Sequence, residues 1–228
     1  MTEGEARPLT LDVGEAGSVS GLWLGPAQAR ACYVFAHGAG AGMTHASMTA
    51  FAVGLAVREV ATLRFQFPFM EKGSKRTDPP AVAQAAVRAA VGEAARRGAG
   101  LPLFAGGRSF GGRMTSQAQA KAPLPGVLGL AFVGFPLHPA GRPGTERAEH
   151  LSTIDVPMLF LQGTRDELAS LDLLNPVVNG LGPNATLQLF DDADHSFHVR
   201  ARSGRNDAQV REAMLDATVA WMASIAAR

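Results

Sequence analysis

The chain has 228 residues, of which 46% are hydrophobic and 18% charged, and a formal net charge of +1. This composition predicts a soluble, folded protein and excludes a disordered one, and the length fits a single domain over residues 1–228. The charge is near zero and no long run of Lys or Arg occurs, which argues against nucleic acid or an anionic membrane as a partner. No apolar segment reaches the length of a membrane span, and the first residues lack the pattern of a secretion signal, so we expect a cytoplasmic protein.

Hydrophobic periodicity and turn residues divide the chain into alternating strands and helices. Strands are predicted over residues 9–13, 19–24, 31–36, 60–67, 101–105, 127–133, 158–161 and 186–190. Helices are predicted over residues 44–58, 80–97, 109–121, 167–181 and 207–226. A Gly-containing turn separates the first two strands and predicts a hairpin, whereas helices separate most of the later strands.

Capping residues support several of these boundaries. Asp78 and the prolines that follow it are expected to begin the helix over 80–97. Asp166 is placed to cap the helix that follows it. Asn206, with Gln209 three positions later, predicts a capping box at the start of the last helix.

The order of these elements predicts the fold class. Strands that alternate with helices at this spacing indicate an α/β fold, a doubly wound and mostly parallel sheet with antiparallel strands at the amino terminus. Ligands bind outside the carboxyl ends of the strands in such a sheet. Residues that carry chemistry are therefore expected in the loops that directly follow strands.

A serine follows the strand over 101–105, in the sequence Gly107-Arg108-Ser109-Phe110-Gly111. A strand closed by G-x-S-x-G and followed by a helix passes through a tight turn, in which only glycine tolerates the crowding on both sides of the serine. The turn exposes the Ser109 hydroxyl at the carboxyl end of the sheet. This arrangement is a nucleophile elbow.

Two nucleotide-binding interpretations of the glycine-rich segments fail. The spacing from Gly107 to Gly112 resembles a phosphate-binding loop, but Arg and Met follow where Lys and Ser or Thr are needed. The segment from Gly38 to Gly42 resembles a dinucleotide loop, but Met43 occupies the third glycine position. We therefore expect no cofactor.

A serine hydroxyl is a weak nucleophile at neutral pH and needs a base within hydrogen-bond reach, which is in turn held by a carboxylate. The loops after two later strands supply both groups. Asp166 follows the strand over 158–161, and His195 follows the strand over 186–190. The chain order Ser109, Asp166, His195 is the order that a nucleophile elbow on this kind of sheet requires, and it predicts a catalytic triad.

Neighbouring residues offer alternatives to two members of the triad. Glu167 and Asp172 are the substitutes for the acid, and His198 competes with His195 as the base. His195 is favoured because it comes first after an acidic turn, whereas His198 lies between Phe and Val in a context typical of packing. The acidic residues of the turn are interpreted as solvated, with one of them placed to accept from the neighbouring backbone: Asp191, Asp192 and Asp194.

Negative charge that develops on a substrate oxygen needs preorganised N–H donors. The backbone amide of Phe110, at the start of the helix after the serine, is predicted as the first donor. The second is predicted in the loop after the strand over 31–36, at the backbone amide of Ala39. His37, which opens that loop, is interpreted as a structural residue.

The remaining histidines and the single cysteine are assigned no chemistry. His45 and His138 lie near loop mouths, where each is expected at the surface or at the edge of a pocket. Cys32 lies within an apolar run, which predicts a buried and unreactive thiol. No cluster of His, Cys and Asp has the spacing of metal ligands, so no metal site is predicted.

Six segments of the chain share their pattern with known hydrolases: His37-Gly-Ala-Gly40, Phe65-Gln-Phe-Pro-Phe69, Gly106-Gly-Arg-Ser-Phe-Gly-Gly-Arg113, Gly134-Phe-Pro-Leu-His-Pro139, Gln162-Gly-Thr-Arg-Asp166 and Asp194-His-Ser-Phe197. On these segments the chain resembles the α/β-hydrolase superfamily over nearly its whole length. It is most similar to the small uncapped hydrolases of the dienelactone-hydrolase-like group, which includes a testis-expressed hydrolase and the hydrolase-like part of a chromatin-complex subunit. The resemblance implies Ser109, Asp166 and His195 as the triad. A dienelactone hydrolase proper carries Cys at the nucleophile position, where this chain has Ser109.

The sequence thus predicts a serine hydrolase that cleaves a small carboxylic ester, or a thioester, through an acyl-enzyme intermediate. Residues 134–150 are too few for a helical cap domain, which favours an open pocket, and the loop Phe69–Asp78 is placed to cover part of it. The second hypothesis is an interaction or scaffold module with this fold and little or no activity. Reaction with a fluorophosphonate probe discriminates the two.

Overall fold

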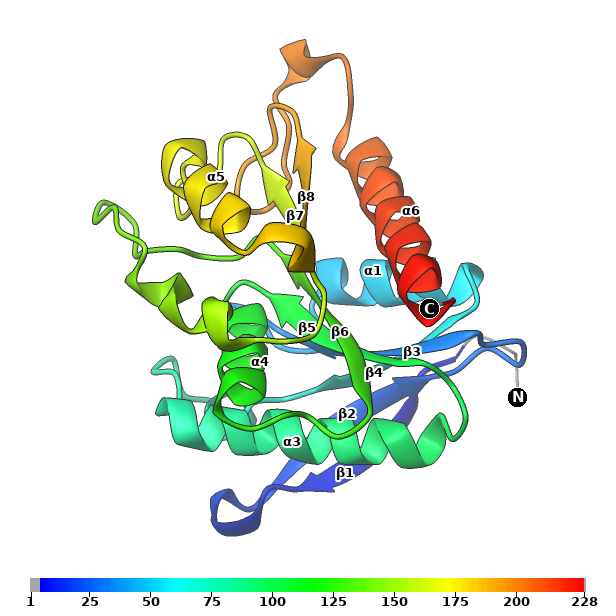
Figure 1. The fold of residues 1–228 in the computed structure, drawn as a ribbon. Helices are drawn as coiled ribbons and strands as arrows, with labels where there is room; N and C mark the ends of the chain where they lie inside the picture. The colour runs from blue at the N-terminus through cyan, green and yellow to red at the C-terminus, as the bar shows by residue number, and fades with distance from the viewer. Residues whose placement is uncertain (1–4, 228) are drawn as a thin grey trace.

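A computed structural model describes residues 5–227, which form an eight-stranded sheet with helices on both faces (Figure 1). The order across the sheet is β1-β2-β4-β3-β5-β6-β7-β8. The strands are β1 (Arg7–Asp12), β2 (Ser18–Leu24), β3 (Ala31–Ala36), β4 (Val60–Phe65), β5 (Leu103–Arg108), β6 (Val127–Val133), β7 (Met158–Gly163) and β8 (Ala185–Phe190). The α-helices are α1 (Ala46–Val57), α2 (Pro68–Glu71), α3 (Pro80–Arg97), α4 (Phe110–Lys121), α5 (Leu171–Gly180) and α6 (Asp207–Ala226). Short 3₁₀ segments are η1 (Gly14–Ala16), η2 (Glu146–Thr153), η3 (Gly182–Asn184) and η4 (Ala201–Ser203).

The strand directions confirm the predicted sheet. β1 pairs antiparallel with β2, and β2 pairs antiparallel with β4. From β4 onward every neighbouring pair across the sheet is parallel. β3 lies in the interior of the sheet with all of its residues buried, as the continuous apolar run indicates.

Two layers of helices cover the sheet. Helices α3, α4 and α5 lie on one face, and α1 and α6 lie on the other (Figure 1). The hydrophobic cluster under α1 and α6 includes Phe35 of β3 and the α6 residues Met214 and Trp221. Helix α6 begins with the predicted capping box, in which Asn206 and Gln209 exchange side-chain to backbone hydrogen bonds.

The expected cap of α3 is wrong. The residue at the N-cap position is Pro79, which has no side-chain donor or acceptor to offer. The carboxylate of Asp78 turns instead toward the preceding segment and accepts a hydrogen bond from Phe69 N at 2.9 Å. Asp78 thus ties the end of the segment between α2 and α3 to the first turn of α2 rather than capping α3.

The expected start of the helix after β7 is also wrong. Helix α5 begins at Leu171, with Ser170 at its N-cap position, rather than directly after Asp166. The residues between Asp166 and Ser170 are held in a loop because Leu168 O accepts from Leu137 N, at 2.9 Å, in the segment that follows β6. This tertiary contact keeps Asp166 at the carboxyl edge of the sheet.

The chain reverses its direction across the sheet at β3. It passes from β3 to β4 on one side and then crosses to β5 on the other, so the carboxyl ends of β3 and β5 flank the topological switch point. Between β6 and β7, the helical structure described is the short segment η2, and no cap domain is inserted among residues 5–227. No helix in that range combines the length and hydropathy that crossing a bilayer requires.

Gly106 of β5 is expected to be among the least replaceable residues. Its φ is +156°, and a Cβ built on it would lie 1.8 Å from the backbone oxygen of Ala131. Since that neighbour is a strand backbone that cannot move aside, Gly106→Ala is expected to lower the free energy of unfolding by about 3 kcal/mol or more in urea denaturation. Gly92→Ala is the matched control, because nothing lies within 4 Å of its Cβ position in α3. This control is expected to gain about 0.5–1 kcal/mol, and similar losses in both variants would contradict the prediction.

Candidate active site

Ser109 lies in the turn between β5 and α4, in a strained backbone conformation. Its φ of 50° and ψ of −115° are rare for a residue with a side chain. A Cβ on Gly107 would lie 2.5 Å from Ala36 O, and one on Gly111 would lie 2.5 Å from His37 O. Glycine is therefore required on both sides of Ser109, because the start of α4 packs directly against the end of β3.

The structure brings Ser109, His195 and Asp166 together from the ends of β5, β8 and β7. Ser109 Oγ lies 2.9 Å from His195 Nε2, and His195 Nδ1 lies 2.7 Å from Asp166 Oδ2. An ionised carboxylate only accepts hydrogen bonds, so the ring proton belongs on Nδ1 and leaves Nε2 able to accept from the serine hydroxyl. The Asp166 side chain is fully buried, whereas 24% of the His195 side chain is exposed.

Two further donors hold the Asp166 carboxylate. The side-chain amide of Gln162 donates to Asp166 Oδ2, and Leu168 N donates to Oδ1 at 2.8 Å. Gln162 is itself buried and its Oε1 accepts from Phe135 N at 3.0 Å. Sequence reasoning missed Gln162, and the signal for it was a polar residue at the end of an otherwise apolar strand.

The acidic turn before His195 is an ordered structure. Asp194 Oδ1 accepts from Ser196 N at 2.8 Å and from His198 N at 3.0 Å, so one carboxylate does bond the neighbouring backbone. Asp192 forms an ion pair with Arg200 and is not simply solvated. The His195 ring rests against Gly134, where a Cβ would lie 3.4 Å from the imidazole.

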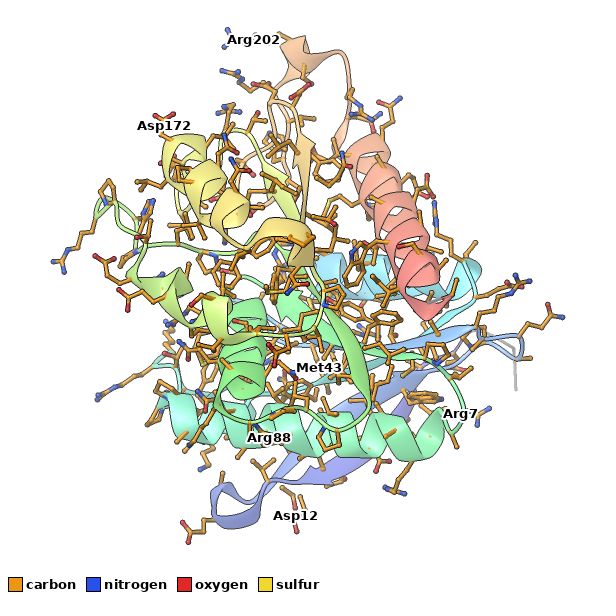
Figure 2. All side chains as sticks on the ribbon, viewed as in Figure 1. Arg7, Asp12, Met43, Arg88, Asp172 and Arg202 are labelled. Carbon is orange, nitrogen blue, oxygen red and sulfur yellow. The ribbon has the colours of Figure 1, made fainter. Side chains whose placement is uncertain are left out.

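The alternative acid and base residues lie outside this cluster. Glu167 and Asp172 are exposed, and Figure 2 shows Asp172 on the outer side of α5. His198 is exposed, and its Nδ1 lies 2.9 Å from Asp207 Oδ2. The structure therefore brings His195 and Asp166, rather than these residues, to Ser109.

The other two histidines near loop mouths differ from each other. His45 is exposed, as expected, and caps α1 by accepting from Ser47 N at 3.2 Å. The expected surface position of His138 is wrong, because only 3% of this residue is exposed. Its backbone N–H is bonded to Leu168 O at 3.2 Å, which draws the residue under the loop before α5.

The backbone amides of Ala39 and Phe110 have no hydrogen-bond acceptor among residues 5–227. The loop after β3 lies against the elbow, since a Cβ on Gly38 would lie 3.8 Å from Ser109 Cβ. His37 Nδ1 donates to Gly38 O at 2.7 Å. The carbonyl and the N–H of one trans peptide point in opposite directions, so this bond turns the Ala39 N–H away from His37.

The loop from His37 to Met43 is anchored at both ends by the end of β4. His37 Nε2 accepts from Phe67 N at 3.0 Å, which shows the structural role expected for this residue. At the other end, Arg64 Nη1 donates to Met43 O at 2.8 Å, and Gln66 Oε1 accepts from Met43 N at 2.8 Å. Sequence reasoning missed both Arg64 and Gln66, because only the folded sheet places β4 under this loop.

Phe69 ties the segment before α3 to the elbow. Its ring packs edge-on against the Phe110 ring, with 5.9 Å between centroids, and Phe67 contacts both. The chain from Lys72 to Arg76 beyond it is exposed. That the segment Phe69–Asp78 covers part of the site stays a prediction.

Cys32 is buried, and burial raises the pKa of its thiol to about 12, as expected for an unreactive cysteine. Within residues 5–227, no three side chains of His, Cys, Asp or Glu are grouped in a way that could hold a metal ion.

Comparison with known proteins gives a family and several related folds. The model of the alpha/beta hydrolase domain family matches residues 29–223. The dienelactone hydrolase from Anabaena variabilis has a TM-score of 0.78 at 18% identity, over 98% of this chain and 99% of that one. An α/β serine hydrolase without lid from Xanthomonas campestris has a TM-score of 0.73 at 22% identity, over 95% of each chain. A cold-adapted esterase from an Arctic intertidal metagenomic library has a TM-score of 0.70 at 16% identity, over 96% of this chain and 94% of that one. At these identities the solved structures show a shared fold.

His37 is expected to make the folded state sensitive to acid. Burial lowers the pKa of its ring from 6.5 to about 4. Between these values the unfolded chain binds more protons than the folded chain, so stability falls as the pH drops through this window. In His37→Asn, the loss of unfolding free energy between pH 7 and pH 4.5 is expected to be smaller than in the wild type by on the order of 2 kcal/mol. Urea denaturation at both pH values measures this difference, and parallel losses in the two proteins would contradict a buried neutral ring.

Proposed function

This chain belongs to the alpha/beta hydrolase domain family, and we propose that it is a serine hydrolase that cleaves a small carboxylic ester or thioester. The observation that carries the proposal is the hydrogen-bonded series from Ser109 through His195 to Asp166, with distances of 2.9 and 2.7 Å. Family membership supports hydrolysis in general. The triad and the acyl substrate are the specific part of the proposal.

In the proposed reaction Ser109 Oγ attacks the carbonyl carbon while His195 Nε2 takes the hydroxyl proton. Asp166 keeps the ring in the required tautomer and stabilises the imidazolium that forms. The N–H groups of Ala39 and Phe110 hold the negative oxygen of the tetrahedral intermediate. His195 then returns the proton to the leaving oxygen or sulfur, and a water molecule activated by the same ring releases the acid from Ser109.

Three observations support acyl transfer at this site. The strained dihedrals of Ser109 are typical of a nucleophile that the fold holds in position. The two proposed oxyanion donors have no acceptor among the described residues. The absence of a cap between β6 and β7 in the described chain favours an open site and a small or exposed substrate. The structural neighbours include a dienelactone hydrolase and an esterase, and these names agree with an acyl substrate.

A fluorophosphonate probe is expected to label Ser109 and no other serine. The wild type should react in a single equivalent, and Ser109→Ala should not react, because the probe needs a serine activated by a base. Ser74→Ala is the matched control, since this exposed serine bonds only the backbone of its own loop. Intact mass spectrometry measures the label and circular dichroism the fold. A folded wild type that resists the probe would favour the scaffold hypothesis, and labelling of Ser109→Ala would mean that another residue is the nucleophile.

Hydrolysis of short-chain esters and thioesters is expected to depend on the triad as a unit. Ser109→Ala and His195→Ala should each lower kcat by roughly 10⁴-fold or more, and the double variant should lose little beyond either single one. Steady-state rates on acetyl and butanoyl esters of 4-nitrophenol and on the matching thioesters measure these effects. Losses that multiply in the double variant would show that the two side chains act independently.

A further inference from the structure

A cavity of about 220 Å³ lies beside the elbow, between α1 and α6. Apolar side chains line it from four elements: Phe35 of β3, Phe51 of α1, Val133 of β6 and Met214 of α6. A second arginine, Arg211 of α6, also forms part of its wall. A cavity of this size suits a short aliphatic chain rather than a long one.

Residues that adjoin Ser109 and His195 in the chain line the cavity. Arg108, which directly precedes Ser109, forms part of the wall, and so do Ser196 and Phe197, which directly follow His195. A substrate whose carbonyl lies at Ser109 can therefore extend into this space. The first turn of α1 also faces the cavity, and the positive end of its helix dipole favours a negative group there.

Arg108 brings a charge into the cavity that the protein does not neutralise. Its hydrogen-bond partner in the structure is Ser47 Oγ, 3.3 Å from Nη1, and no carboxylate of residues 5–227 lies within 4 Å of its guanidinium. Burial lowers the pKa of Arg108, although Asp194 and Asp166 act at longer range in the opposite direction. A guanidinium in this position has unused donors in a planar fork that matches a carboxylate.

The acidic groups around the cavity are engaged elsewhere. Asp166 is bonded to His195, and Asp194 accepts from the backbone of its own turn. Asp207 lines the cavity, but its two oxygens accept from Val199 N and His198 Nδ1. Among residues 5–227, Arg108 thus forms no ion pair with a neighbouring carboxylate, and Asp194 acts on it only at longer range.

We propose that this cavity binds a carboxylate carried by the substrate, and that Arg108 is the residue that recognises it. The inference rests on the proposed function and narrows it to esters that bear a second, negatively charged group. The apolar walls contact the methylene groups between the ester and the carboxylate, and the guanidinium holds the charged end.

The test compares esters of equal length with and without the charge. Monoethyl glutarate is paired with ethyl pentanoate, which places the carboxylate on the acyl side, and 3-acetoxybenzoate is paired with 3-methylphenyl acetate, which places it on the leaving group. The wild type is expected to favour the charged member of at least one pair by about tenfold or more in kcat/KM, the effect of one charged hydrogen bond. Proton release measures the rates.

Variants of Arg108 test whether its side chain causes the preference for the charged ester. Arg108→Met should bring the ratio within the favoured pair close to one, and Arg108→Lys should keep part of it, because charge remains without the fork. Arg113→Met is the matched control for a general loss of positive charge, since Arg113 lies in the first turn of α4 and does not line the cavity. This control should keep the wild-type ratio. Equal rates within both pairs, or a preference that survives Arg108→Met, would overturn the proposal.

A binding measurement separates this proposal from the proposed function. If the wild type cleaves none of the four esters, ester hydrolysis itself fails, but calorimetry with the Ser109→Ala protein still decides the role of Arg108. Binding of a charged ester, absent for its neutral partner and lost when Arg108→Met is added, supports the carboxylate site. Absence of binding by both charged esters overturns it.

Discussion

The close approach of α4 to the carboxyl ends of β3 and β5 is the constraint on which the site depends. Gly107 and Gly111 leave no room for a side chain, since a Cβ on either would lie 2.5 Å from a backbone oxygen of the β3 end. This approach places the first amide of α4 and the loop after β3 on two sides of Ser109. The strained dihedrals of Ser109 arise from the same turn. Packing of a helix against a sheet therefore supplies the preorganisation that the proposed acyl transfer requires.

A second constraint is that polar groups buried below the carboxyl edge of the sheet must have hydrogen-bond partners. Gln162 satisfies Asp166 on one side and Phe135 N on the other, so a fully buried carboxylate sits within a complete set of donors. His37 does the same for the opposite wall, where its neutral ring joins Gly38 O to Phe67 N. Gln162 and His37 thus each hold in place a group that faces the reacting centre, although neither side chain touches that centre. Loss of either support would misplace a group at the reacting centre and would also leave buried polar atoms without hydrogen-bond partners.

Much of the site could be predicted because parallel strands end at one edge of a sheet. Ser109, Asp166 and His195 each follow a strand, so their convergence follows from the fold class once the strands are recognised. The start of α5 could not be predicted, because the bond from Leu137 N to Leu168 O joins two loops and leaves no local pattern. Arg108 occupies a position of the G-x-S-x-G motif that admits many residues, so nothing in the motif marks it. The role proposed for Arg108 follows only from the folded structure, in which the residue lines a cavity and has no carboxylate of residues 5–227 close to its guanidinium.

The two proposals meet at the residues that flank the reacting pair. Arg108 directly precedes Ser109, and Ser196 and Phe197 directly follow His195, so the two turns that hold the proposed nucleophile and base also form part of the cavity wall. A carboxylate bound to Arg108 would therefore fix the distance between the charged end of the substrate and its ester carbonyl. An interaction that only holds the bound ester lowers KM, whereas one that positions the carbonyl for attack raises kcat.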